Sequence, residues 1–141
     1  MNYKKTRYKG KIKHFSVGAL IKKDNKFLLI DRKKVPYGWA PPAGHIDEGE
    51  TSIQALKREV KEEANLKVKS FKLIKKFNNL KFGCRRIGSY HEIYVYSCKW
   101  SGNLKIEKSE AKRYKWYKKE ELSKIKLEAV WKKILKELKI L

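Results

Sequence analysis

The sequence predicts a single α+β domain over residues 1–141. A chain of 141 residues can bury one sizeable core, and it contains neither an internal repeat nor a low-complexity linker. Several short runs have the alternation and composition of strands, whereas two segments carry apolar residues at helical spacing. One helical segment lies between strand runs and the other at the C-terminal end, which is a mixed α+β order.

The N-terminal part of the chain predicts mainly strands. Residues 1–13 are basic and polar, and we expect a flexible basic arm there, either loose or weakly paired. Two strand-like runs follow at residues 15–22 and 26–32. Asp24 and Asn25 lie between these runs and predict a hairpin turn. Prolines and a glycine interrupt residues 35–43, which predicts an irregular connector that leads into a short extended piece.

Residues 51–64 predict the principal helix. Ile53, Leu56 and Val60 lie on one face of such a helix and form its apolar side. Further strand runs are expected at residues 66–77, 85–100 and 112–117, with turns at 78–79 and 101–103 and a turn or short helix at 118–122. Apolar residues at helical spacing predict an amphipathic helix over residues 128–141.

Residues 44–66, GHIDEGETSIQALKREVKEEANL, hold most of the functional information. They contain six acidic residues in a chain whose formal net charge is +22. Glu59, Glu62 and Glu63 stand at positions i, i+3 and i+4, so their carboxylates project from one face of the helix. Like charges at this spacing repel one another, and folding does not require them. Carboxylate oxygens bind Mg²⁺ and Mn²⁺, so a metal site is the hypothesis and a solvated acidic face the alternative.

Three residues at fixed offsets before the glutamates favour the metal site. Gly44, Glu50 and Arg58 complete a pattern that resembles the signature of the Nudix hydrolase family, G-x5-E-x7-R-E-U-x-E-E-x-G-U, where U is apolar. Eight of its nine specified positions match, over 23 of the 141 residues. The departure is Asn65, where the family has glycine. Because Asn tolerates the left-handed conformation that ends a helix, we expect no consequence for the fold or the metal.

The resemblance implies a fold, a cofactor and a reaction. Its fold is an α/β/α sandwich around a central mixed β-sheet. The carbonyl of Gly44 and the carboxylates of Glu59, Glu62 and Glu63 are implied to bind the metal, and one of these glutamates commonly acts as the catalytic base. Such a site suits attack of water on a phosphoanhydride, because cations neutralise the phosphate oxygens. Arg58 is placed to pair with Glu50, which gives both a structural role.

Residues outside the motif are weaker candidates. Glu110 stands where many Nudix enzymes have an acidic residue that acts as a further metal ligand or as the base, and an ordinary solvated glutamate is an equal alternative. Trp39 is a candidate for stacking on a nucleobase, although aromatic residues in a small domain are more often core. Arg85 and Arg86 are candidates for phosphate contacts, in a chain where basic residues are abundant.

The resemblance leaves three functional hypotheses. A downstream proline or tyrosine that marks the ADP-ribose and diadenosine-polyphosphate branches is absent, which favours a MutT-like pyrophosphohydrolase that converts an NTP or modified dNTP to NMP and pyrophosphate. The alternatives are a hydrolase of RNA 5′ ends, either a pyrophosphohydrolase or a decapping enzyme, and a catalytically silent module that binds through its basic surface. A nucleotide is the expected partner in the first case, and RNA in the second.

The amino-acid composition limits the partners that the protein can be expected to bind and indicates its cellular location. Of the 37 basic residues, 31 are Lys and only six are Arg, whereas base and phosphate recognition relies mainly on Arg. Cys84 and Cys98 form neither a zinc spacing nor a disulfide framework, and the first residues lack the pattern of a secretory signal. No apolar run approaches the 18 residues of a membrane span. We therefore expect a reducing, cytoplasmic location and no membrane partner.

Overall fold

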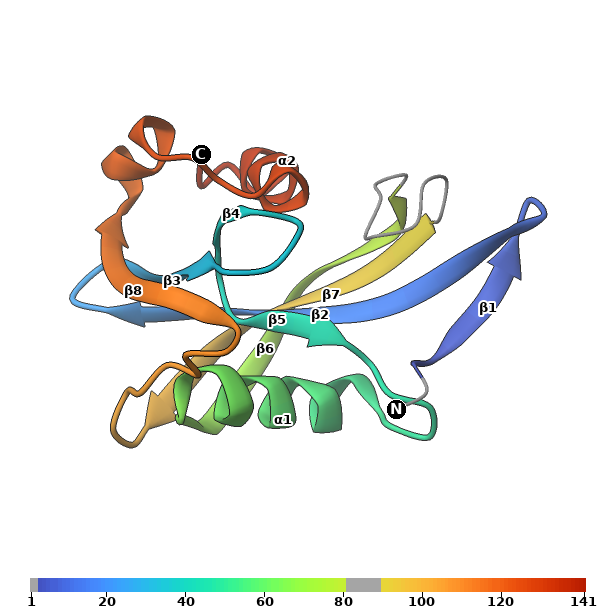
Figure 1. Cartoon of the computed structure of the whole chain (residues 1–141), viewed down its shortest axis with the longest axis horizontal. Coiled ribbons are helices and arrows are strands. Elements are labelled where there is room, and N and C mark those ends of the chain that lie inside the picture. The colour runs from blue at the N-terminus through green and yellow to red at the C-terminus, as the bar shows by residue number, and fades with distance from the viewer. Residues whose placement is uncertain (1–2, 81–89) are drawn as a thin grey trace.

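A mixed β-sheet with helices on both sides forms the protein (Figure 1). The computed structural model describes residues 3–80 and 90–141. The described strands are β1 (Lys5–Tyr8), β2 (Lys11–Lys23), β3 (Lys26–Arg32), β4 (Gly38–Ala40), β5 (Ala43–His45), β6 (Lys67–Leu80), β7 (Tyr90–Ser101) and β8 (Ala111–Lys118). The described helices are α1 (Ser52–Ala64), the short 3-10 helix η1 (Lys119–Lys124) and α2 (Ala129–Glu137).

Strand β2 is the centre of the sheet. It pairs antiparallel with β1, β3 and β5, and parallel with β7. The parallel register with β7 places His14 directly opposite His91. Strand β6 lies beyond β7, while β4 and β8 both pair with β3. Parallel and antiparallel pairs therefore occur in one sheet, and the expected mixed sheet is confirmed.

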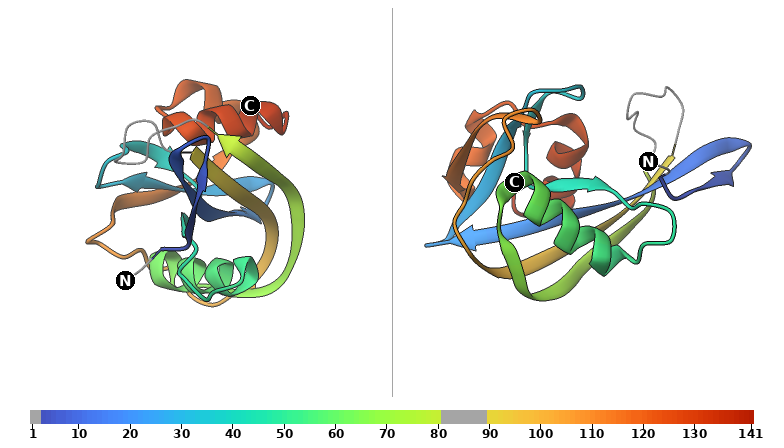
Figure 2. Two further views of the ribbon diagram at one scale, coloured as in Figure 1. Left: turned by 90° about the vertical axis from the view of Figure 1, so that its right-hand side faces the viewer. Right: turned by 60° about the horizontal axis from the view of Figure 1, so that its bottom comes forward.

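The helices cover opposite faces of the sheet (Figure 1 and Figure 2). One cluster of buried apolar residues lies between α1 and the sheet and includes Ile21, Leu56 and Val60. A second cluster includes Trp131 and Ile134 of α2 and occupies the other face. This arrangement is the expected α/β/α sandwich. Among the described residues, no helix is both long enough and apolar enough to cross a membrane.

The N-terminal segment is not the flexible basic arm that the sequence predicted for residues 1–13. Every residue of β1 pairs with β2, so this part of the chain is a regular hairpin. Just before β1, the backbone N–H of Lys4 donates to the carbonyl of Ile46 at 2.8 Å. Tyr3 forms an isolated β-bridge with Asp47. From Tyr3 onward the segment is therefore hydrogen-bonded to β2 and to the loop that follows β5.

Two element boundaries also differ from the prediction. The turn expected at residues 78–79 lies within β6, which continues to Leu80 with a shift of register after Phe77. Asn79 has a φ of 54°, so the turn residue is accommodated in a local bulge instead of reversing the chain. The terminal helix ends at Glu137, earlier than its apolar pattern suggested.

Strand β6 is an exposed edge of the sheet. Among the described strands it pairs only with β7. It carries five lysines and no acidic residue, and the side chains of Phe71, Leu73 and Ile74 are exposed. Lysines on an edge strand disfavour its pairing with a further strand, because each would bring a charge to the new interface.

Gly18 of β2 lies directly beneath Trp131 of α2. A Cβ atom at Gly18 would overlap the six-membered ring of Trp131, so this helix packs on bare backbone. We predict that Gly18→Ala lowers the free energy of unfolding by about 1–3 kcal/mol through overpacking. Urea unfolding measures the loss. In a double-mutant cycle, Trp131→Phe removes ring atoms from the contact and should make the two losses less than additive; additive losses would contradict the contact.

Candidate active site

A cleft of about 960 Å³ brings the expected metal-binding residues together. Gly44 of β5 and the three glutamates of α1, Glu59, Glu62 and Glu63, all line it. Other parts of its lining come from β2, from β7, from the loops around β3 and β8, and from the start of α2. The cleft therefore combines an acidic helix face with strands that are distant in sequence.

Local interactions fix both ends of α1. Thr51 and Gln54 form a capping box at the N-terminus, with each side chain bonded to the other residue's backbone N–H. At the C-terminus Asn65 has φ 58° and ψ 30°, the left-handed conformation expected for this position. Its side-chain amide also donates to the carbonyl of Asn103 at 3.1 Å. The departure from glycine thus retains the helix end and adds a bond to the loop between β7 and β8.

Gly44 is required by the position of Glu59. A Cβ atom at Gly44 would overlap the carboxyl group of Glu59. The carboxyl group therefore packs directly on the backbone of β5, which a larger residue at position 44 would prevent. This contact explains physically why a glycine must precede the acidic helix at this spacing.

The carboxyl groups of Glu59 and Glu63 form a hydrogen-bonded pair. Burial raises the pKa of Glu63 well above its ordinary value, and the charge of Glu59 raises it further. Burial raises the pKa of Glu59 as well. The carboxyl group of Glu63 is enclosed although the residue as a whole is partly exposed, and the backbone N–H of Ala43 acts in the opposite direction by lowering its pKa. Two enclosed acids in contact must share a proton or be neutralised by a cation.

The guanidinium of Arg58 organises the surrounding acids. Its Nε and Nη2 donate to the two carboxylate oxygens of Glu50 at 2.7 and 3.0 Å, which is the expected pair. Nη2 also donates to the carbonyl of His45 at 2.9 Å. Nη1 donates to Glu59 at 2.8 Å and to Glu62 at 3.3 Å. The side-chain bond from Arg58 lowers the pKa of Glu50 despite partial burial.

The donor set fits a divalent cation, with one difference from expectation. Glu59 and Glu63 meet, whereas the side chain of Glu62 is 55% exposed and is held by Arg58. In residues 3–80 and 90–141, no three His, Cys, Asp or Glu side chains are gathered closely enough to enclose a metal ion by themselves. A cation between Glu59 and Glu63 would replace their shared proton, and hard oxygen ligands of this kind suit Mg²⁺.

The weaker candidates have different positions. Glu110 lines the cleft, with its side chain 50% exposed and its Oε1 2.9 Å from Nζ of Lys34. Trp39 does not line this cleft: it is 8% exposed and belongs to the core on the α2 side of the sheet. Arg85 and Arg86 lie outside the described residues.

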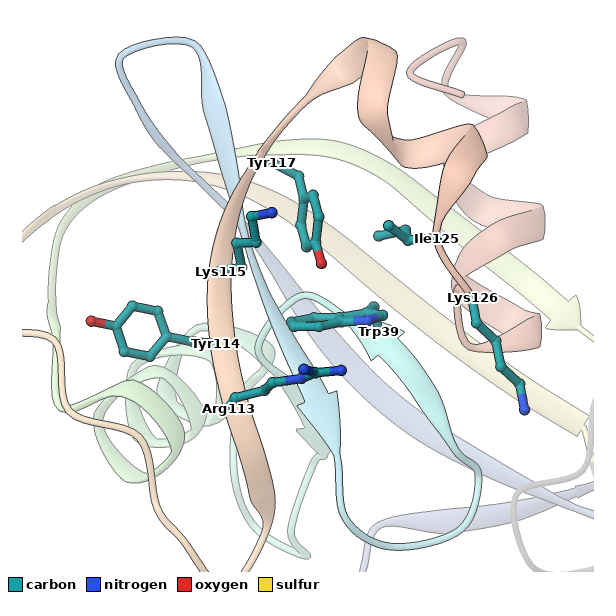
Figure 3. A pocket seen from close by; sticks show the side chains of 7 residues that line it. All are labelled: Trp39, Arg113, Tyr114, Lys115, Tyr117, Ile125 and Lys126. Atoms are coloured by element: carbon teal, nitrogen blue, oxygen red, sulfur yellow. The ribbon is translucent and has the colours of Figure 1, made fainter.

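A separate hollow of about 330 Å³ contains Trp39 (Figure 3). Its indole ring meets Tyr117 edge to face, with ring centroids 5.1 Å apart. The guanidinium of Arg113 lies 5.2 Å from the centre of the indole ring. Trp39 therefore lines this hollow and not the acidic cleft, and its stacking on a substrate base stays a prediction.

The three histidines are the site residues that the sequence did not indicate. His14, His45 and His91 are the only histidines of the chain, and all three line the cleft. They come from β2, β5 and β7. The sequence places His14 and His91 in or beside strand-like runs, but it does not show that the two strands are neighbours. Only the register between β2 and β7 brings the two histidines together.

Comparison with known proteins supplies the family. A model of the NUDIX domain matches residues 12–138, from the second residue of β2 to just beyond the end of α2. The chain belongs to the Nudix family. The MutT protein of Methanosarcina mazei Go1 shares the fold, with a TM-score of 0.76, 21% identity, and coverage of 90% of this chain and 93% of that chain.

The relatives of this Nudix protein are named for different activities. The 8-oxo-dGTP diphosphatase of Buchnera aphidicola subsp. Schizaphis graminum is 32% identical over 102 residues, 71% of this chain and 72% of that protein. The asymmetrical bis(5′-nucleosyl)-tetraphosphatase of Caenorhabditis elegans is 51% identical over 41 residues, 29% of this chain and 30% of that protein. The latter match thus spans less than a third of the relative.

The Arg58 network predicts a stability effect that depends on pH. Glu50→Gln should lower the free energy of unfolding at pH 7 by about 1–3 kcal/mol, because charged hydrogen bonds to Arg58 are lost. The lowered pKa of Glu50 means that this contribution is present above its ordinary value of 4.5 and is lost as pH falls through the lower folded value. Urea unfolding at several pH values tests it. Glu48→Gln, exposed on the same loop, is the control and should change little.

The Glu59–Glu63 pair predicts the opposite effect. Because the folded pKa of Glu63 is raised, its ionisation costs stability as pH rises above the ordinary value of 4.5. Without metal at neutral pH, Glu63→Gln should be more stable than the wild type, and the difference should vanish in acid. Mg²⁺ should raise the melting temperature of the wild type more than that of the variant. Equal Mg²⁺ shifts would contradict a cation at this pair.

Proposed function

We propose that this Nudix protein is a divalent-metal-dependent hydrolase of phosphoanhydride bonds in nucleoside diphosphate compounds. The observation that carries the proposal is the enclosed contact between the carboxyl groups of Glu59 and Glu63 against Gly44, within a cleft large enough for a nucleotide. A folded protein gains nothing from placing two acids in contact, whereas a bound cation makes the arrangement favourable.

The most specific form of the proposal is a nucleoside triphosphate pyrophosphohydrolase. Its substrate is an NTP or a modified dNTP, and its products are NMP and pyrophosphate. The share of each relative that aligns with this chain supports the proposal. The 8-oxo-dGTP diphosphatase aligns over 72% of its length, whereas the tetraphosphatase aligns over only 30% of its length. The longer match, over 102 residues, extends well beyond the 23 residues of the metal-binding motif.

The residues of the cleft can divide the chemical work. When bound, Mg²⁺ or Mn²⁺ would neutralise phosphate charge and acidify water; Glu59 and Glu63, with Glu62 and the carbonyl of Gly44, would hold it. Water adds to a phosphorus, the bond to the bridging oxygen breaks, and a carboxylate receives the proton of the water. Glu110 or a glutamate of α1 is the candidate for that base.

Positive charge for the phosphates comes from the end of β3 and the loop after it. Arg32, the last residue of β3, and Lys34, in the loop that follows, both line the cleft. The Nε of Arg32 donates to the carbonyl of Pro36 at 2.7 Å, which orients its guanidinium. Fixed cations in a partly enclosed cleft favour the charge that develops on phosphate oxygens during the reaction.

A second candidate function is hydrolysis of the 5′ end of RNA. The observation that favours it is the lysine-rich edge strand β6, which offers five positive charges for a polyanion. Its affinity for short RNA should then fall steeply with salt, with a log–log slope of about −0.7 per phosphate contact. A binding constant that hardly changes from low to moderate salt would exclude this use of the strand.

A catalytically silent binding module fits less well, because it has no use for the buried acid pair.

The direct test is hydrolysis of a nucleotide panel with Mg²⁺, including modified dNTPs, dinucleoside polyphosphates, ADP-ribose, and triphosphorylated and capped RNA. We expect turnover that EDTA abolishes. Glu63→Gln and Glu62→Gln should each lower the rate about a hundredfold or more, since each removes a charged ligand of the cation. Glu48→Gln is the matched control and should retain the rate. Near-wild-type rates for both ligand variants at saturating Mg²⁺ would contradict the proposed metal site.

A further inference from the structure

The hollow that contains Trp39 is separate from the acidic cleft, and no residue lines both. Its lining comes from β4, from β8 and from the segment between η1 and α2. The backbone of Trp39 holds that segment in place. Its N–H donates to the carbonyl of Lys126, and its carbonyl accepts the N–H of Glu128, both at 2.9 Å. Because β8 is in turn paired with β3, the hollow has a fixed frame.

Three basic side chains and no acidic one line this hollow, namely Arg113, Lys115 and Lys126. Arg113 and Lys115 stand two positions apart on β8, so both point to the same face of the sheet. Figure 3 shows all three basic side chains around the indole ring of Trp39. Like charges gathered in this way repel one another, and an anion between them relieves the repulsion.

Arg113 is held in position although its side chain is 69% exposed. Its guanidinium lies over the indole ring of Trp39, and its Nε donates to Oδ2 of Asp31 at 3.1 Å. Within residues 3–80 and 90–141, its Nη1 and Nη2 have no hydrogen-bond partner. A guanidinium fixed in this way presents two nitrogens side by side, which is the geometry that binds a phosphate through two parallel hydrogen bonds.

Two acids near the hollow reduce its positive charge without removing it. Asp31 neutralises part of the guanidinium charge. Glu121 is fully exposed, and the backbone N–H of Lys118 and then the charge of Lys115 lower the pKa of its carboxyl. The charges of Lys118 and Lys26 lower this pKa as well, so Glu121 is shared among several lysines. Neither acid lines the hollow, which therefore keeps a net positive lining.

We propose that this hollow binds a terminal phosphate or pyrophosphate group, at a site apart from the hydrolytic cleft. Nη1 and Nη2 of Arg113 bind two of its oxygens, and the Nζ groups of Lys115 and Lys126 neutralise further charge. The buried rings of Trp39 and Tyr117 exclude water from one side, which strengthens these charged contacts. The inference does not rest on the proposed hydrolysis, because the two sites share no residue.

A carboxylate and a nucleic-acid backbone are the other anions that a guanidinium binds. A carboxylate or a phosphodiester carries a single negative charge, whereas a terminal phosphate carries about −1.5 to −2 at neutral pH. Three cations around one hollow fit the more highly charged group. The volume of about 330 Å³ also corresponds to a site for a small ligand rather than for an extended chain.

Titration with pyrophosphate in EDTA at fixed ionic strength tests the site. The indole N–H signals of the four tryptophans, assigned by triple-resonance NMR, act as local reporters. Trp39 reports on the hollow, whereas Trp131 lines the cleft and reports on it separately. We expect a saturable shift of the Trp39 signal. Arg113→Gln should weaken this binding about tenfold, and Arg113→Lys should also weaken it, because lysine cannot bind two oxygens side by side.

Arg7→Gln is the matched control, because it removes the same charge from an exposed position on β1 and should leave the binding unchanged. Melting curves verify folding, and Lys126→Gln, in the same hollow, replaces Arg113→Gln if that variant does not fold. A Trp39 signal that does not shift, or that shifts equally in the hollow variant and in Arg7→Gln, would overturn the inference. A saturable shift confined to Trp131 would overturn it too, while supporting a phosphate site in the cleft.

Two further anions distinguish the ligand classes. Succinate and a short RNA with a 5′-hydroxyl end should each bind more weakly than pyrophosphate, as followed by the same Trp39 signal. Tighter binding of succinate would assign the hollow to carboxylates, and tighter binding of the RNA would assign it to a nucleic-acid backbone. Either result would overturn the proposed ligand.

Discussion

The position of Arg58 is the constraint on which the site depends. Its guanidinium binds Glu50 in the loop, Glu59 and Glu62 on the helix, and the carbonyl of His45 on β5. Each of these acids would repel the others without a central cation. Because the guanidinium is planar and always charged, it can fix several oxygens at once in a way that lysine cannot. Loop, strand and helix therefore form one unit around a single side chain.

Stability and chemistry compete at this unit. Because Gly44 has no side chain, the carboxyl group of Glu59 can lie against the backbone. Enclosing the carboxyl group of Glu63 disfavours its charged form and so lowers the stability of the fold at neutral pH. Natural sequences that break local rules commonly do so at functional sites. In this protein the unfavourable features are confined to a few residues around the acid pair. The capping box of α1 and Asn65 at the end of that helix follow ordinary helix rules.

The sequence predicts those features of the structure that arise from residues close together along the chain. The hairpin at Asp24 and Asn25, both with positive φ, follows from turn chemistry, and α1 follows from its caps and apolar face. The Arg58–Glu50 pair follows from a motif within a few helical turns. The histidine cluster depends on a parallel register between strands about 77 positions apart, from His14 to His91. No local pattern encodes that register, and the burial of Trp39 is non-local in the same way. The hairpin of β1 is local, because Lys9 and Gly10, both with positive φ, form its turn.

The lysines of β6 have a consequence for the behaviour of the protein in solution. A long, open strand edge with exposed Phe71, Leu73 and Ile74 is the kind of surface through which identical molecules associate. Two copies approaching through this edge would also bring five lysines each into opposition. Self-association is therefore held back by charge, which salt screens over about 8–10 Å at ordinary ionic strengths. We therefore expect concentrated samples to associate less at low than at high ionic strength, opposite to the salting-in common for less charged proteins.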